Sequence, residues 1–472
     1  MPRYFVTLIV AVALFMETMD STIIATSLPA IAADLGEDPI ALKLALTSYL
    51  LSLAVFIPVS GWMADRFGAR TVFRAAIVVF TLGSAACGFA QGLGDFILFR
   101  VVQGMGGAMM VPVGRLVILR SVPKSELISA LAWLTVPALM GPVIGPPLGG
   151  FITTMFSWRW IFWINIPIGL LGVYLATRFI HNFREEEVPP LDVKGFFLSG
   201  IGLAGLAFGF TVIGQPLFTA PVVASLLIVG AIALTLYVRH ALRTPAPLLD
   251  LRLLKIDTFF ASVVGGFLYR IGIGATPFLL PLLFQLGFGM TPLQSGLLTF
   301  SGAVGAIAMK TTAAPIIRRI GFKRVLVWNA VVSTLFIAAV ILFTEATPAA
   351  VILAVLLIGG FFKSLQFTAI NTIAYADIAE RDMSKATSFA SVAQQLSMSA
   401  GVAVGAAVLE FERLGRDTHE VMASDFPPAF LIVAGLAAAS ALIFMRLPKH
   451  AGSSLSRKAH PVGEPQETAE TV

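Results

Sequence analysis

The stretch GWMADRFGARTVFR, residues 61–74, joins two long apolar runs through a very short polar turn. Gly68 permits the tight backbone that such a turn requires, and Asp65 can pair with the nearby arginines at a membrane surface. The candidate gating residues are Gly61, Asp65, Arg66, Gly68 and Arg70. On spacing alone, the turn fits a gating charge cluster and a plain positively charged loop, and both interpretations stay open.

Around this turn the whole chain is strongly apolar. Of its 472 residues, 57% are hydrophobic and 12% are charged, and the mean hydropathy is +0.89. Soluble domains are about half apolar and about a quarter charged. A polar shell cannot cover so much apolar surface, so the composition predicts an all-α membrane protein built from spans of about 20 residues.

Apolar runs of spanning length recur along the chain and predict fourteen transmembrane helices. They lie near residues 5–28, 45–64, 71–91, 96–119, 129–153, 160–180, 195–214, 220–238, 257–284, 293–314, 325–343, 349–375, 386–409 and 427–446. The Gly214–Gln215–Pro216 break favours two spans over one re-entrant segment within 195–238.

The basic residues orient the chain in the membrane. With a cytoplasmic N-terminus, 23 of the 32 Lys and Arg lie inside and five lie within spans. The other four, on the outside, are Lys43, Arg159, Arg413 and Arg416. Because cytoplasmic loops carry the excess of Lys and Arg, this distribution predicts a multi-pass protein of the cell (inner) membrane with both termini cytoplasmic. It indicates topology, not a nucleic-acid partner, despite the net charge of +6.

The sequence lacks the residues that disulfides, metal sites and nucleotide binding require. Cys87 is the only cysteine, and the five histidines lie outside the apolar runs, so we expect no disulfide, metal or cofactor. Residues 305–311 superficially resemble a phosphate loop, but Met309 replaces the glycine required before Lys310. We therefore expect neither ATP as the energy source nor an enzyme.

Charged residues inside the first and fourth runs are candidates for proton coupling. Glu17 and Asp20 are three residues apart and share a helix face. A carboxylate in lipid must be protonated, paired or hydrated, and the depth of Asp20 roughly matches that of Arg100. We predict that Asp20 and Arg100 form the proton-responsive unit, with Glu17 as a second acceptor and Gln103 on the same polar face as Arg100. A purely structural ion pair is the alternative.

The remaining intramembrane charges are basic. Arg115, Arg270 and Lys363 lie within spans, whereas Lys310 is close enough to a span end to snorkel. If the first three face one cavity, its interior is cationic. The expected substrate is then anionic or zwitterionic, such as an organic acid or a carboxylated drug.

The fifth run is rich in glycine and proline. Gly141, Gly145 and Gly149 recur every fourth residue and form a ridge without side chains, which allows close helix contact. Pro142 and Pro146 remove backbone donors and bend the helix.

Two internal echoes predict a duplicated architecture. The turn at 65–70 is echoed by RRIGFK at 318–323, with Arg318 in place of the acidic residue, and the pair Arg100 and Gln103 is echoed by Lys363 and Gln366. We therefore expect a parallel repeat of two six-helix bundles. The predicted units are residues 1–180, 181–245 with two additional spans, 246–448, and a disordered cytoplasmic tail at 449–472.

Together these strings resemble the major facilitator superfamily. The turn at 61–74 is similar to its signature loop, in which Asp and Arg latch the cytoplasmic sides of the two halves. Residues 100–104 resemble its R-x-x-Q-G motif, associated with proton coupling, and GPVIGPPLGG at 141–150 resembles the antiporter motif of its exporters. Residues 19–29 resemble the first-helix motif of drug:proton antiporters, and WRWIFWINIPIG at 158–169 is typical of the fourteen-span EmrB/QacA group, in which the MdtD type looks most similar.

This resemblance implies a proton-driven antiporter that exports drugs or other small molecules by alternating access, with small-molecule substrate, protons and the lipid bilayer as partners. We expect it to work as a monomer. The alternatives are a narrow exporter of an organic anion or metabolite and a passive facilitator or channel.

Overall fold

The computed structural model describes residues 5–122, 127–185, 188, 190–213, 218–379, 382–414 and 420–452, with only the backbone at 5 and 127–139. Every regular element in this part of the chain is helical. Gly214–Gln215–Pro216, Arg416 and the tail from residue 453 lie outside the described residues, so the expectations placed on them stay predictions.

The first group of helices runs from residue 5 to 179. It consists of α1 (Phe5–Ile23), η1 (Ile24–Ser27), α2 (Leu28–Leu35), α3 (Lys43–Phe67), α4 (Ala69–Cys87), α5 (Leu93–Ser121), α6 (Leu127–Met155), α7 (Trp160–Trp163) and α8 (Asn165–Phe179). The first span is longer than predicted. Pro29 does not end it but sits in the first turn of α2, where proline is tolerated, so the chain continues through a short 3₁₀ turn to Leu35.

A helical hairpin follows, and then a second group. The hairpin is α9 (Val193–Thr211) and α10 (Ala220–Arg243). The second group consists of η3 (Leu251–Lys255), α11 (Asp257–Phe260), η4 (Ala261–Gly265), α12 (Gly266–Leu282), η5 (Leu283–Gly287), α13 (Pro292–Ile320), α14 (Phe322–Ala338), η6 (Ala339–Leu342), α15 (Ala349–Ile373), α16 (Met383–Arg413), η8 (Ala423–Asp425) and α17 (Phe426–Phe444).

The span count agrees with the apolar runs. Thirteen helical stretches of the described residues are long and apolar enough to cross a membrane. Helix α6, 29 residues long, is the fourteenth. The prediction of fourteen membrane helices is confirmed, and 195–238 forms two helices instead of one re-entrant segment.

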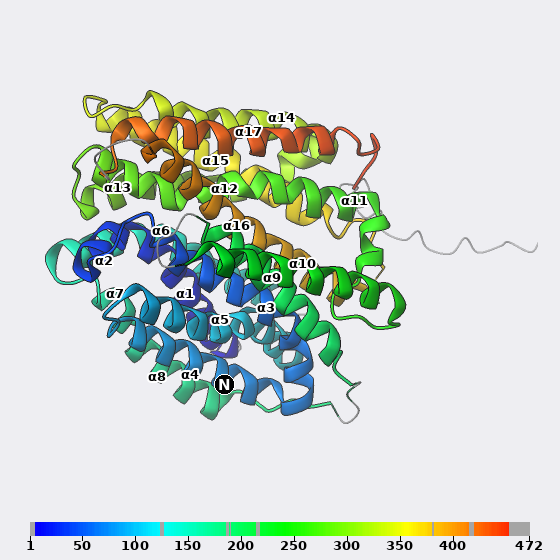
Figure 1. The fold of residues 1–472 in the computed structure, drawn as a ribbon. Coiled ribbons are helices and arrows are strands. Elements are labelled where there is room, and N and C mark those ends of the chain that lie inside the picture. The colour runs from blue at the N-terminus through cyan, green and yellow to red at the C-terminus, as the bar shows by residue number, and fades with distance from the viewer. Residues whose placement is uncertain are drawn as a thin grey trace, which may run out of the picture.

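The two groups lie side by side, with the hairpin between them. Figure 1 shows α1–α8 in blue to cyan in the lower half, α12–α17 in the upper half, and α9 and α10 in front of the boundary. The groups meet where α6 packs on α13 and α3 packs on α16, and α9 contacts both α3 and α16. The predicted unit boundaries at 180 and 245 stay a prediction.

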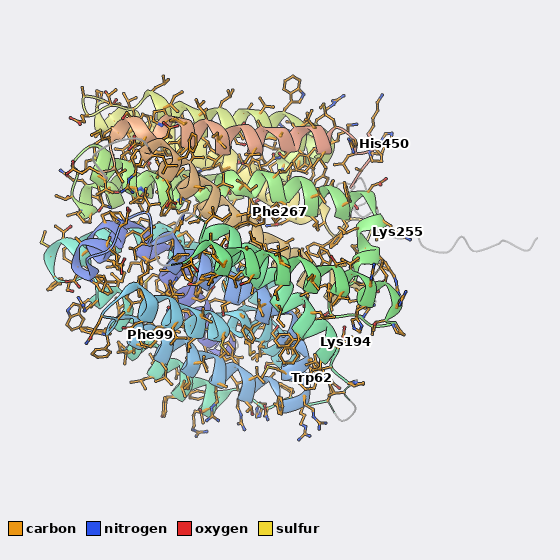
Figure 2. The ribbon with its side chains drawn as sticks, viewed as in Figure 1. Trp62, Phe99, Lys194, Lys255, Phe267 and His450 are labelled. Atoms are coloured by element: carbon orange, nitrogen blue, oxygen red, sulfur yellow. The ribbon has the colours of Figure 1, made fainter. Side chains whose placement is uncertain are left out.

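The two sides of the molecule differ in how tightly the groups are joined. We call the side where α1 begins and α17 ends the terminal side; Lys194, Lys255 and His450 mark it at the right in Figure 2. On the opposite side, one apolar core takes residues from both groups, among them Ile24 and Phe284. Towards the terminal side, each group has a separate core. A smaller cluster that includes Ala54 and Val392 also links α3, α10 and α16. The groups are therefore packed more extensively on the opposite side than towards the terminal side.

Candidate functional site

A cavity of about 570 Å³ lies between the two groups. One wall comes from α1, α3 and α5, and the other from α12, α15 and α16, with Tyr375 just beyond α15. Among the described lining residues the charged ones are Glu17, Arg100 and Arg115, and all three belong to the first group.

A buried ion pair joins the lining residue Arg100 to Asp20, which lies behind the wall. Arg100 Nη1 donates to Asp20 Oδ2 at 2.7 Å, and both side chains are fully buried. Asn165 Nδ2 donates to the other carboxylate oxygen of Asp20 at 2.9 Å. The predicted pairing of Asp20 with Arg100 is confirmed as geometry. With a donor on each oxygen, the Asp20 carboxylate is satisfied without water.

Arg100 is held on several sides. Its Nη1 also donates to Gln103 Oε1 at 2.7 Å, and its Nε donates to the backbone carbonyl of Ala45 at 3.4 Å. The guanidinium carbon lies 4.2 Å from the centre of the Tyr49 ring, within the range of a cation–π contact. These contacts fix the guanidinium between α1, α3 and α5.

Glu17 lies one helical turn from Asp20 but in a different environment. It is 8% exposed and lines the cavity, whereas Asp20 has no exposed surface and does not line it. Tyr49 donates its hydroxyl to Glu17 Oε1 at 3.0 Å. Glu17 is therefore the carboxyl group that reaches the cavity.

The structure separates the three predicted cavity cations. Arg115 lines the cavity and is exposed. Arg270 is 2% exposed and donates to Asn371 Oδ1 at 2.6 Å, so it lies behind the cavity wall. Lys363 lines a separate small void with Phe336. The prediction that all three line one cavity is wrong for Arg270 and Lys363, because depth along a helix can be counted from sequence but helix rotation cannot.

The polar turn of the first group is held by ion pairs. Arg120 at the end of α5 donates to Asp65 at 2.9 Å and to Glu185 at 2.7 Å. Gly68 adopts a φ of +92°, and a Cβ there would overlap the side chain of Asn182. These interactions of the turn stay within the first group and the segment after it.

The other predicted residues of the turn have simpler surroundings. Arg70 Nη1 reaches the carbonyl of Ile180 at 3.5 Å, Arg66 is exposed, and a Cβ on Gly61 would meet open space. Gly321, in the predicted echo, has a φ of +87° and closes α13 as Gly68 closes α3.

The glycine ridge of α6 packs against α1 and η1. A Cβ at Gly141 or Gly145 would overlap Thr18 or Thr22, and one at Gly149 would overlap Ile23. The hydroxyl of Thr22 donates to the carbonyl of Gly141 at 3.3 Å. Pro142 lies within α6, and the carbonyl of Pro146 accepts from Thr26 at 3.4 Å.

On the opposite side, two ion pairs join the groups. Lys43 Nζ lies 3.0 Å from Glu410, and Arg413 Nη1 lies 2.7 Å from Asp38. Lys43 and Asp38 belong to the first group, whereas Glu410 and Arg413 lie at the end of α16. Neither pair was predicted, since partners more than 360 residues apart leave no local signal in the sequence.

Tyr49 and Asn165 were also not predicted as partners of the two carboxyl groups. Both side chains are uncharged and lie on helices that reach Glu17 and Asp20 only in the folded chain. A polar residue within an apolar run was the one signal available, and serine and threonine give the same signal without such a role.

Comparison with known proteins agrees with this architecture. The family model described as "Major Facilitator Superfamily" matches residues 10–263 and 262–467. The "Putative multidrug resistance protein MdtD" of Yersinia pestis (strain Pestoides F) is 39% identical over 462 residues, covering 94% of this chain and 96% of its own.

Solved structures share the fold. A crystal structure of the peptide transporter POT matches with a TM-score of 0.70 and 14% identity, covering 95% of each chain. The crystal structure of a D-xylose-proton symporter matches with a TM-score of 0.67 and 15% identity, covering 95% of this chain and 99% of its own. Two helical groups around a central cavity, with family matches over most of the length, identify the chain as a multi-pass membrane transporter, not an enzyme, and as a member of the Major Facilitator Superfamily.

Proposed function

We propose that this transporter is a proton-driven antiporter that exports drugs or other small molecules from the cytoplasm by alternating access. The excess of Lys and Arg on the terminal side supports a cytoplasmic location for both termini. The cavity then opens to the cytoplasm, since the groups are packed together on the opposite side. The relatives named for multidrug resistance support export of foreign compounds.

The observation that carries the proposal is the different access of the two carboxyl groups on α1. Glu17 reaches the cavity, whereas Asp20 is sealed with a donor on each oxygen. A carboxyl that contacts cavity water can exchange its proton while the fold stays intact. We therefore assign proton carriage to Glu17 and a fixed, charge-compensating role to Asp20, Arg100 and Gln103, which reverses the order predicted from the sequence.

The cycle follows from this assignment. While the cavity opens to the cytoplasm, substrate enters and Glu17 releases its proton. After the groups rock and the opposite side opens, substrate leaves and Glu17 takes up a proton. The membrane potential contributes about 2.3 kcal/mol per charge per 100 mV, so one proton can drive substantial accumulation. The turn at residues 65–70 is expected to latch the terminal side when that side closes.

A narrow exporter of an organic anion or metabolite is a second candidate, favoured by the exposed Arg115 in the cavity wall. A passive facilitator is the third. It would equilibrate substrate without driving it uphill, so accumulation against a gradient separates it from the other two.

The test uses the purified chain in inside-out proteoliposomes with an imposed proton gradient. A panel of cationic dyes, drugs and organic acids is offered, and both uphill uptake and proton counterflow are recorded. We expect Glu17→Gln to lower gradient-driven uptake at least tenfold while the protein stays folded, and Glu37→Gln, outside the cavity, to match the parent. Parent-like uphill uptake in Glu17→Gln would overturn the assignment, and downhill flux alone in the parent would favour the facilitator.

A further inference from the structure

The cavity wall carries two opposite charges at different depths. A Cβ at Gly107 would lie 3.6 Å from Glu17 Cγ and 3.0 Å from the Tyr49 hydroxyl, so Gly107 marks the level of Glu17 on α5. Arg115 lies eight residues further along the same helix, towards the terminal side. At about 1.5 Å per residue, the two levels are about 12 Å apart.

Glu17 and Arg115 are open to a ligand, whereas Arg100, the third charged residue of the wall, is not. Arg100 is committed to Asp20 and Gln103. Arg115 is exposed, and no hydrogen bond or ion pair joins it to the other residues that the structure describes. Glu17 accepts from Tyr49 through one carboxylate oxygen, Oε1.

The facing wall supplies uncharged polar groups. Its lining residues include Asn371, Ser391, Gln394 and Gln395. Arg270 lies behind that wall and donates to Asn371. Opposite charges at two levels of one wall, facing amides and hydroxyls, form a surface complementary to a long molecule with a cation at one end and an anion at the other.

We infer that this cavity selects elongated zwitterions, with the cationic group of the substrate at Glu17 and the anionic group at Arg115. The inference rests on the proposed function for its transport consequence but concerns binding, which needs no gradient. It narrows the substrate from small molecules in general to those that carry both charges and are long enough to span two levels about 12 Å apart along α5.

The proton cycle favours a zwitterion over a simple anion. A cationic group at Glu17 competes with the proton there, as exchange requires. An anion bound at Arg115 alone would instead favour the protonated form of Glu17, so anion and proton would travel in the same direction. The groups that face Glu17 are Asp20 from α1, Tyr49 from α3 and Arg100 from α5, and the described lining residues of the other wall carry no charge.

The experiment measures binding to the purified full chain in lipid nanodiscs by calorimetry. The probes are 11-aminoundecanoate, its methyl ester, which keeps only the cation, and its N-acetyl derivative, which keeps only the anion. We expect the parent to bind the zwitterion about tenfold or more tightly than either single-charge probe, a difference of about 1.4 kcal/mol or more.

Variants assign each end of the probe. Arg115→Gln should bind zwitterion and methyl ester equally, Glu17→Gln should bind zwitterion and N-acetyl derivative equally, and Arg115→Lys should keep the preference. A parent that binds the methyl ester as tightly as the zwitterion overturns the inference, and so does an Arg115→Gln variant that keeps the parent's preference.

This readout separates the two proposals. Charge-selective binding without gradient-driven uptake would leave the inference standing and remove the antiporter. Gradient-driven uptake with no preference for the zwitterion would support the antiporter and overturn the inference.

Discussion

At the scale of single residues, one helical turn separates two carboxyl groups with different surroundings. Asp20 is enclosed by Arg100 and Asn165, and Asn165 is itself held by its contact with Ser84 Oγ at 3.0 Å. Glu17 meets the cavity and one tyrosine hydroxyl. A buried charge is tolerated where its oxygens have donors, so Asn165 stabilises the Asp20 carboxylate together with its charged partner.

Replacing Asn165 tests whether its hydrogen bond to Asp20 stabilises the fold. Asn165→Ala leaves Asp20 Oδ1 without its donor in a buried site, which should lower the free energy of unfolding by about 1–3 kcal/mol. Thermal unfolding of the purified protein in detergent measures the change. Thr235→Ala is the control, because that exposed hydroxyl bonds only to the carbonyl of Ala231 in its own helix and should change stability by less than about 0.5 kcal/mol. Equal stability of both variants would contradict the role given to Asn165.

At the scale of elements, the packing of α6 on the first span joins two of the recognised motifs. The glycines of α6 and the threonines of α1 and η1 both recur every fourth residue, so each ridge meets the other over several turns. Helix interfaces in membranes depend on such close packing, because lipid removes the hydrophobic drive between helices. This interface holds the helix that carries Glu17 against the helix that carries the glycine ridge.

A methyl group placed in this interface should lower the free energy of unfolding. Gly145→Ala puts a Cβ against Thr22 Oγ1, so we expect a loss of about 1–3 kcal/mol, seen as a lower midpoint of thermal unfolding. Thr22→Ala in the same chain should restore part of that loss. Gly435→Ala is the matched control, because a Cβ there meets nothing within 4 Å and alanine favours a helix over glycine. A Gly145→Ala variant as stable as the parent would refute the packing argument.

At the scale of the whole molecule, the two groups are fastened on one side. The ion pairs Lys43–Glu410 and Asp38–Arg413 and the shared apolar core all lie on the opposite side. Gln285 of the second group also donates to the carbonyl of Thr26 at 2.9 Å. In the proposed transport cycle these contacts break when that side opens, so their strength would set the population of the two states.

Neutralising both pairs should shift that population. In Lys43→Gln/Arg413→Gln we expect the state open on the opposite side to gain about three- to tenfold, since partly exposed pairs contribute roughly 1 kcal/mol or less each. Nitroxide labels on Ala33→Cys and Glu420→Cys report the change as a longer distance in pulsed electron resonance. Arg159→Gln is the control, because its pair with Asp34 lies within the first group. An unchanged distance distribution in the double variant would contradict the fastening role.

The periodicity and composition of the sequence were sufficient to predict the fold of this chain. Continuous apolar runs of about 20 residues become helices in lipid, because a helix satisfies its backbone donors within its own segment, whereas barrel strands are shorter and alternate in polarity. The fourteen helices, the tight turn at Gly68 and the depth match of Asp20 with Arg100 all depend on distance along the chain, which the sequence states directly.

The tertiary structure alone decided which polar groups meet. Helix rotation places Arg115 in the cavity wall, Arg270 behind it and Lys363 elsewhere, and it gives Glu17 rather than Asp20 access to the cavity. Rotation depends on how each helix packs against neighbours far away in sequence, so no count along a single helix could supply it. The same reason hides the Lys43–Glu410 pair, whose partners are brought together only when the two halves close on the opposite side.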